Sequence, residues 1–365
     1  MFAQFTRAIG LNDVCDSLRL HSGLIHTLRG ATAPSRNALS HANKHRSADM
    51  AEALTWQVLA HLQSICPAFG QISGRRQLVP RFKKSIQIVD STTIGLIARC
   101  MDWASHRRRK AAAKCHVRLD MRSFLPQCVI IGSGREADAP KAPRLCATLQ
   151  KGEIVIFDRA YFDLVHLHDL NQRGVFWILR GKETLNVRVV KRLQTPRHTG
   201  FILRDDIVEF KGEVSQGRYP SPMRRVIALV EVDGKMQEMT FLTNNFTWAA
   251  SSVAELYRCR WQIEVFFKQI KQVLQISDFL GNSANAVRWQ LWTALLVYIL
   301  LRFQAFQSRW ASSFTRLWAV VRSAIWLKID LLQFLRSCGT AGGSFRLLGQ
   351  PEQAYLPGFD HAAVG

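Results

Sequence analysis

The chain has 365 residues, of which 48% are hydrophobic and 21% are charged, and this composition excludes wholesale disorder. A chain of this length is expected to hold two or three domains. Its 49 lysines and arginines exceed its 27 acidic residues, which gives a formal net charge of +22 at pH 7. Such an excess predicts binding to a polyanion, above all to the phosphate backbone of a nucleic acid.

Three further features argue against a membrane protein or an exported protein. The longest nearly uninterrupted apolar run, residues 291–301, is shorter than the roughly 20 residues that a spanning helix needs. Residues 1–15 lack the basic segment and the apolar stretch of an export signal. The eight cysteines form no C-x-x-C pair, which predicts reduced thiols and neither a disulfide framework nor a zinc site. We therefore expect a cytoplasmic protein without a membrane partner.

Residues 1–80 are predicted to form a helical, DNA-binding domain. Three segments carry apolar residues at three- and four-residue steps: 13–20, 34–43 and 47–66. The middle segment exposes polar and basic side chains, namely Arg36, Asn37, His41 and Lys44. It could be the helix of a helix-turn-helix unit that enters a DNA groove. A solvated polar helix without this role explains the same pattern equally well.

From Lys84 onward the hydrophobic period changes to that of strands. Three consecutive strands are predicted, at 85–90, 115–120 and 128–132. The chain then alternates between helix and strand, at 143–149, 153–158, 163–171 and 175–179. The continuously apolar run 153–158 is typical of a central strand that is covered on both faces. This alternation predicts the α/β class.

The segment 186–245 interrupts the alternation. It contains five short runs of strand character, separated by glycine and proline turns: 187–190, 201–203, 207–210, 226–230 and 239–242. We interpret this segment as a β-rich insertion within a catalytic domain of residues 84–300. Helical patterning continues to about residue 335 and a Gly-rich, loose tail follows from Gly339, so residues 301–365 are predicted as a C-terminal helical region and tail.

Two of the predicted strands end in an aspartate, Asp90 and Asp158. Side chains at the carboxyl ends of central strands face the crevice in which α/β folds place their sites. A single strand-end aspartate is more often a turn or capping residue, but two of them on neighbouring strands indicate a shared site. Asp120 also ends a strand, but it lacks the Ser-Thr-Thr sequence that follows Asp90, and we interpret it either as structural or as a residue that supports the acids of the site without touching the reacting groups.

A third carboxylate comes from the helix after the predicted insertion. Residues 252–255 match a capping box, which predicts that this helix begins there. At about 100° per residue, four polar side chains fall within roughly 60° of arc beside the buried apolar stripe: Tyr257, Arg260, Glu264 and Lys271. The alternative is an exposed helix face on which Glu264 pairs with Lys268 or Arg260, which would contribute only a few tenths of a kcal/mol.

These residues resemble the motifs of a known family. The signature Y-x2-R-x3-E-x6-K of the insertion-sequence-four family of bacterial DDE transposases is matched by Tyr257, Arg260, Glu264 and Lys271. The tetrapeptide Asp90-Ser91-Thr92-Thr93 resembles the first-aspartate motif of that family. Asp158-Arg159-Ala160-Tyr161 is similar to its second motif, in which glycine is usual at the position of Ala160. The resemblance covers residues 85–300, with the three motifs in the family's order.

The resemblance implies a ribonuclease H-like catalytic core in which Asp90, Asp158 and Glu264 bind two Mg²⁺ ions, for which Mn²⁺ can substitute. One ion would activate water or a DNA 3′-hydroxyl, and the other would stabilise the leaving oxygen of an in-line phosphoryl displacement. By the same resemblance, Arg260 and Lys271 would contact phosphates near the cleaved end, and Tyr257 would position the strand terminus.

The predicted function is therefore that of a transposase, which cuts the ends of its element and joins them to target DNA. Its partners would be the double-stranded DNA of the terminal inverted repeats and of the target, in the cytoplasm of a bacterium at the nucleoid. Synapsis of two ends implies a homodimer. No nucleotide cofactor is predicted, because no glycine precedes Gly181 at the interval that a phosphate-binding loop requires.

Two alternatives to this function stay open. The first is a ribonuclease H-like nuclease that cleaves without strand transfer, and the second is a catalytically decayed transposase that acts as a sequence-specific DNA-binding protein. In some members of the family the β-rich insertion handles the transposon end through a hairpin and a flipped base. Trp248 or Trp261 could stack on such a base, although buried packing is the more common fate of a tryptophan.

Overall fold

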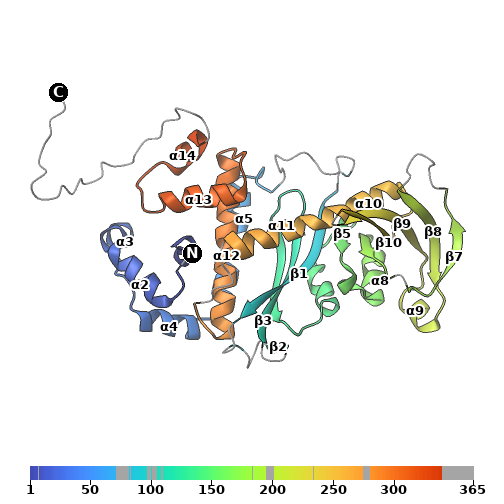
Figure 1. The fold of residues 1–365 in the computed structure, drawn as a ribbon, viewed down its shortest axis with the longest axis horizontal. Coiled ribbons are helices and arrows are strands. Elements are labelled where there is room, and N and C mark those ends of the chain that lie inside the picture. Colours follow the sequence, from blue (N-terminus) through green and yellow to red (C-terminus); the bar gives the residue numbers. More distant parts are fainter. Residues whose placement is uncertain are drawn as a thin grey trace, which may run out of the picture.

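A computed structural model of the protein describes residues 1–6, 8–70, 82, 84–96, 100, 105–107, 110–182, 184–194, 201–232, 234–273 and 280–338. A mixed α/β body with one large sheet lies beside a group of helices that come from both ends of the described chain (Figure 1). The predicted α/β class is therefore confirmed. The tail predicted from Gly339 lies outside the described residues.

The centre of the sheet consists of five strands: β1 (Ile86–Leu96), β3 (Lys110–Asp120), β4 (Pro126–Ser133), β5 (Ile154–Phe157) and β6 (Phe176–Arg180). Their order is β4-β3-β1-β5-β6, with antiparallel pairs on one side of β1 and parallel pairs on the other. The short strand β2 (Ser105–Arg107) also pairs with β3. All five predicted strands are present, but β1 continues past Asp90 to Leu96, so the prediction that this strand ends at Asp90 is wrong.

The strand-rich segment extends the same sheet. It forms four antiparallel strands: β7 (Val187–Arg192), β8 (Ile202–Phe210), β9 (Met223–Val232) and β10 (Lys235–Thr243). β10 pairs with β6 and so joins these strands to the central ones. The predicted runs 201–203 and 207–210 are one strand, because Asp205 and Asp206 between them form ion pairs with two arginines of β9 and are therefore buried within the sheet. A helix that was not predicted, α9 (Glu213–Arg218), follows β8.

Each face of the central sheet is covered by helices, and strand alternation decides which side chains meet them. Ile88, Ile154 and Ile156 belong to a core that also contains the helices after the strand-rich segment. Val155 and Phe157 belong to a second core on the other face. That second face is covered by α7 (Ala142–Leu145), which directly follows η2 (Ala139–Lys141), and by η3 (Arg159–Tyr161) and α8 (Leu164–Gln172). β5 is thus buried on both sides, which confirms the prediction from its apolar run.

The N-terminal region contains five helices: α1 (Phe2–Thr6), α2 (Leu11–Leu20), α3 (Ser22–Arg29), α4 (Arg36–His45) and α5 (Asp49–Ile65). The three predicted helices correspond to α2, α4 and α5, while α1 and α3 were not predicted. The C-terminal part of the described chain adds α12 (Ala284–Gln307), α13 (Phe314–Ala324) and α14 (Leu331–Ser337). α5 lies along α12, at the boundary between the helical region and the sheet (Figure 1).

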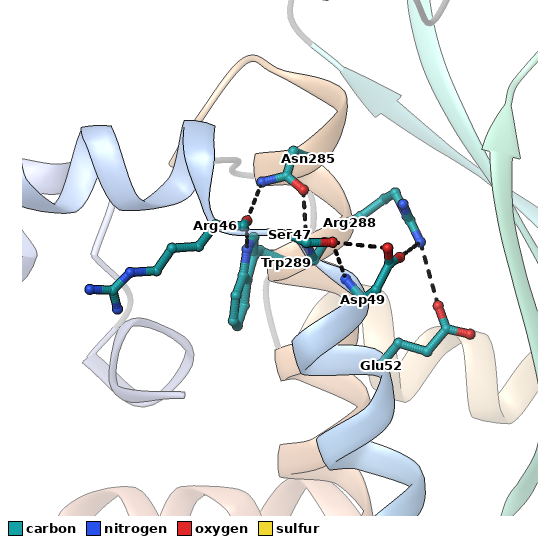
Figure 2. A network of polar contacts seen from close by, with 8 residues as sticks. Arg46, Ser47, Asp49, Glu52, Asn285, Arg288 and Trp289 are labelled. Carbon is teal, nitrogen blue, oxygen red and sulfur yellow. Dashed lines mark hydrogen bonds and ion pairs between the residues drawn. The ribbon is translucent and has the colours of Figure 1, made fainter.

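Polar contacts fasten the start of α5 to α12 (Figure 2). The amide of Asn285 donates to the backbone carbonyl of Arg46, and its Oδ1 accepts the backbone N–H of Ala48. The Arg288 guanidinium reaches the carboxylates of Asp49 and Glu52 from the next turn of α12. These contacts place the N-terminal helices on a fixed surface of α12.

α12 has the length and hydropathy of a membrane-spanning helix, but 61% of its most apolar window is buried inside the protein. It also crosses residue 300, where the sequence predicts the end of the catalytic domain. The division into residues 1–80, 84–300 and 301–365 stays a prediction.

Candidate active site

Asp90 and Asp158 lie side by side on neighbouring strands. The parallel register pairs Val89 with Phe157, and Asp90 and Asp158 directly follow these two residues. The two aspartates are therefore close together, because adjacent strands are about 4.8 Å apart. Asp90 lies two residues after Ile88 and therefore faces the same side of the sheet. Although β1 does not end at Asp90, its pairing with β5 ends there, because the chain leaves β5 for η3 while β3 continues to pair with β1.

The helix that covers these aspartates is irregular. It consists of α10 (Ala250–Arg258), a 3-10 turn η4 (Cys259–Trp261), α11 (Gln262–Lys268) and a π-helical turn η5 (Gln269–Val273). Its apolar side is buried against the sheet, as predicted, at Leu256, Ile263, Phe266 and Ile270. The predicted start at a capping box is wrong, because the N-cap is Ala249 and Ser252 is already buried within the first turn. A side-chain turn at Asn245 reverses the chain just before the helix and allows this earlier start.

Arg260 and Tyr257 connect this helix to both aspartates. Arg260 Nη1 donates to Asp90 Oδ2 at 2.5 Å, and its Nη2 donates to Glu264 Oε1 at 3.1 Å. The hydroxyl of Tyr257 donates to Asp158 Oδ1 at 3.2 Å. The three carboxylates, from β1, from the end of β5 and from α11, therefore meet around two side chains of one helix.

The electrostatics of this cluster follow from its burial. The Asp90 side chain is 15% exposed and that of Glu264 is 40% exposed. Burial raises the pKa of Asp90 to about 6 against the opposing effect of Arg260, and the charges of Asp158 and Glu264 add to the rise. Burial alone would lower the pKa of Arg260, but the surrounding acids outweigh it and raise this pKa. Burial also raises the pKa of Tyr257, so its hydroxyl stays protonated and can donate to Asp158.

Residues 81–300, which contain all three acids, match the family model described as "Transposase DDE domain". The chain belongs to this transposase DDE domain family. "Putative transposase y4zB" of Sinorhizobium fredii is 33% identical over 241 residues, which cover 65% of this chain and 66% of the relative. "Probable transposase for insertion sequence element IS5377" of Geobacillus stearothermophilus is 30% identical over 230 residues, or 63% of this chain and 58% of the relative.

A third relative, "Transposase InsG for insertion sequence element IS4" of Escherichia coli, is 23% identical over 195 residues, or 51% of this chain and 42% of the relative. The predicted resemblance to DDE transposases of the insertion-sequence-four family is therefore confirmed. The chain spans less than two thirds of the length of these relatives. A solved piggyBac transposase synaptic complex with hairpin DNA aligns with a TM-score of 0.40 and 9% identity, over 92% of this chain and 79% of that chain.

In this transposase DDE domain, Lys271, the fourth residue of the helix signature, contacts the part of β1 that follows Asp90. Lys271 Nζ donates to the backbone carbonyl of Thr93 at 2.8 Å. Burial lowers the pKa of Lys271. The phosphate contacts expected of Lys271 and Arg260 stay predictions, since both side chains bond to the protein itself in this structure.

Asp120 has the structural role that the sequence predicts. It lies at the opposite end of β1, where its Oδ1 accepts the backbone N–H groups of Arg122 and Ser123. Its Oδ2 accepts the hydroxyl of Ser85. These bonds hold the turn between β3 and β4, away from the cluster at Asp90.

A polar group that was not predicted from the sequence lies behind the candidate site of this transposase DDE domain. Ser91, Lys114, His116, Asp138 and Tyr161 are linked by hydrogen bonds and ion pairs. One signal was available, because polar residues alternate with apolar ones along β3: Lys114, His116, Arg118 and Asp120. On a strand whose other face is core, such polar side chains are buried and must find partners.

The donor set of the domain fits a divalent cation, because carboxylate oxygens are the ligands that Mg²⁺ prefers. Within the described part of the chain, no group of three or more His, Cys, Asp or Glu residues already has the spacing of a metal-binding set. The Arg260 guanidinium lies between Asp90 and Glu264 and forms an ion pair with each of them. Among the residues that the structure describes, its buried Nε atom has no hydrogen-bond partner, so the guanidinium is only partly satisfied there.

Proposed function

We propose that this chain is a DDE transposase, which cleaves transposon-end DNA and transfers the cut strand into target DNA. The observation that carries the proposal is the meeting of Asp90, Asp158 and Glu264 around Arg260 and Tyr257, on a domain of the transposase DDE family. The strand order β4-β3-β1-β5-β6 supports a ribonuclease H-like core. Strands β7 to β10, which precede the helix of Glu264, support a β-rich insertion at about 186–245.

Asp90, Asp158 and Glu264 would hold the two Mg²⁺ ions of this reaction. When bound, the ions supply positive charge that activates the attacking oxygen and stabilises the leaving oxygen of the phosphodiester. Asp90 lies in β1, where the backbone still pairs with β3, and Asp158 directly follows β5, while Glu264 comes from the covering helix. Asp90 and Asp158 would therefore be fixed by the sheet, whereas Glu264 would move with its helix.

The helix residues orient the acids and meet the DNA. Tyr257 would fix one oxygen of Asp158 by its hydrogen bond, so that the other oxygen can face a metal ion. Arg260 would exchange its bonds to Asp90 and Glu264 for a phosphate of the cleaved strand, which a guanidinium binds well in a bidentate manner. Lys271 would contact a neighbouring phosphate from the same helix face.

Trp261 is the better of the two tryptophans for stacking on a displaced base. Its side chain is 57% exposed, next to Arg260. Trp248, in contrast, packs edge-on against Phe82 and Phe176. A base stacked on an exposed aromatic ring contributes about 1–3 kcal/mol.

Double-stranded DNA is the partner that the net charge of +22 favours. We propose residues 1–80 as the DNA-binding domain, because α4 has no buried residue and carries Arg36 and Lys44 on its exposed side. Residues 84–300 would be catalytic, followed by a C-terminal helical region in 301–365. The active complex would be a homodimer that joins two transposon ends, in the bacterial cytoplasm at the nucleoid.

The test is an incubation of the protein with Mg²⁺, DNA that carries the terminal inverted repeats of the element, and a supercoiled target plasmid. We expect nicked ends and joined products from the wild type. Glu264→Gln should abolish both products while the dissociation constant for the end DNA stays within about twofold. Cleavage without joining would instead identify a nuclease, and specific binding without any cleavage would identify a decayed transposase.

A further inference from the structure

A polar group lies on the face of the sheet opposite to Asp90. Because neighbouring residues of a strand point to opposite faces, Ser91 points away from the side that Asp90 faces. His116 pairs with Ser91 in the register of β1 and β3 and therefore shares its face. Tyr161, in η3, belongs to the core of that same side.

Four side chains of this group are linked in series by polar contacts. Ser91 Oγ donates to Asp138 Oδ1 at 2.6 Å, and the same carboxylate oxygen lies 3.3 Å from His116 Nδ1. That imidazole nitrogen is in turn 3.2 Å from the hydroxyl of Tyr161. Lys114 Nζ donates to the second oxygen of Asp138 at 2.8 Å and balances its charge.

This series of contacts connects the two chain segments that carry the aspartates. The parallel pairing of β1 with β5 ends at Val89 and Phe157, one residue before each acid. Beyond that point β3 still pairs with β1, but backbone pairing no longer joins β1 to the chain after β5, and Ser91 directly follows Asp90. Tyr161 ends the short turn that begins after Asp158. His116 and Tyr161 are buried, and Ser91, Lys114 and Asp138 are half-buried, so the loss of one partner leaves polar groups that are largely cut off from water without a hydrogen bond.

We propose that Asp138 and His116 are positioning residues of the DDE site. Through Ser91 and Tyr161 they hold the carboxylates of Asp90 and Asp158 at the separation that binds the metal ions. The inference rests on the function proposed above. It explains why a serine directly follows the first acid and a tyrosine lies three residues after the second one.

The experiment measures the affinity of the DNA-free protein for Mn²⁺ by electron paramagnetic resonance, together with its melting temperature. Asp138→Asn keeps the shape of the side chain and removes its charge, while Tyr161→Phe removes only the hydroxyl. We expect each substitution to weaken Mn²⁺ binding by 10- to 100-fold, as is typical when a partner of a metal ligand is lost. Excess Mn²⁺ should then restore nicking of end DNA, because the site is misplaced rather than unfolded.

Asp120→Asn is the matched control. Asp120 is also a buried carboxylate on the same face of β3, but its bonds hold the turn at the far end of the strand. This substitution should lower the melting temperature and leave the Mn²⁺ affinity within about twofold of wild type. It separates a general loss of stability from a specific loss of metal positioning.

The outcomes distinguish this proposal from the proposed function. If Asp138→Asn and Tyr161→Phe both bind Mn²⁺ with wild-type affinity while Asp158→Asn does not, only the positioning role is overturned. The positioning role is also overturned if Asp138→Asn and Tyr161→Phe lose no more Mn²⁺ affinity than Asp120→Asn does. Absence of Mn²⁺ binding by the wild type and by Arg260→Ala alike would overturn both proposals, because Arg260 does not compete for the carboxylates in that variant.

Discussion

Arg260 and Asp90 are 170 residues apart in the sequence, yet Nη1 of the arginine lies 2.5 Å from Oδ2 of the aspartate. The same guanidinium also forms an ion pair with Glu264, so one positive charge of the protein is shared between two of the three candidate acids. A metal ion bound at these acids would need the same carboxylate oxygens. Arg260 is therefore placed as an internal counter-ion that would have to move before a metal ion could bind there.

Removal of Arg260 should strengthen metal binding and weaken catalysis. We expect Arg260→Ala to raise the Mn²⁺ affinity of the DNA-free protein on the order of tenfold, which corresponds to about 1.4 kcal/mol. The titration should be made at pH 8.5, because the loss of Arg260 raises the pKa of Asp90 further. Nicking of end DNA should fall at the same time, since the phosphate contact is lost. A lower Mn²⁺ affinity than that of wild type would contradict the role of internal counter-ion.

The pH dependence of stability should report the burial of Asp90. The pKa of Asp90 is about 6 in the folded protein, against the ordinary value of 3.8 for an aspartate, so the folded state binds the proton more tightly than the unfolded state. The free energy of unfolding should therefore fall as the pH rises from about 4 to about 6, by on the order of 3 kcal/mol from this group. Urea unfolding in the presence of a chelator measures it, with Asp90→Asn as the comparison. If the difference in the free energy of unfolding between the wild type and Asp90→Asn does not change with pH, the raised pKa of Asp90 is refuted.

Loss of the Tyr257 hydroxyl should affect the reaction more than the fold. Tyr257→Phe keeps the ring that packs on Phe241 and removes the hydrogen bond to Asp158. We expect the nicking rate to fall about tenfold, while stability changes by about 1 kcal/mol. Tyr298→Phe is the matched control, because the hydroxyl of Tyr298 bonds to the carbonyl of Phe124 in the core. Equal nicking rates in the two variants would show that Tyr257 has no orienting role.

Lys271 should contribute to DNA affinity through charge. Lys271→Gln is expected to weaken binding of end and unrelated DNA alike, and to reduce the slope of log affinity against log salt concentration by about 1. Filter binding at several salt concentrations measures both quantities. Lys328→Gln, at an exposed position after α13, provides the control and should leave the slope unchanged. An unchanged slope in Lys271→Gln would mean that its bond to Thr93 persists in the complex.

The elements and motifs that local periodicity encodes were predictable. The apolar run of β5 predicted a strand buried on both sides, and helical spacing predicted that Tyr257, Arg260 and Glu264 share one face. Both features depend on repeats of two or about 3.6 residues, which are visible in any short window of sequence. The acids themselves were identified because their spacing and order match a family.

Element boundaries and side-chain partners were decided by tertiary structure. β1 runs past Asp90 because β3 continues to pair with it, and the helix of Glu264 starts early because Asn245 turns the chain. The bond between Arg260 and Asp90 joins segments 170 residues apart. No local pattern reports such a contact, because it depends on which strand and which helix the fold brings to the same face.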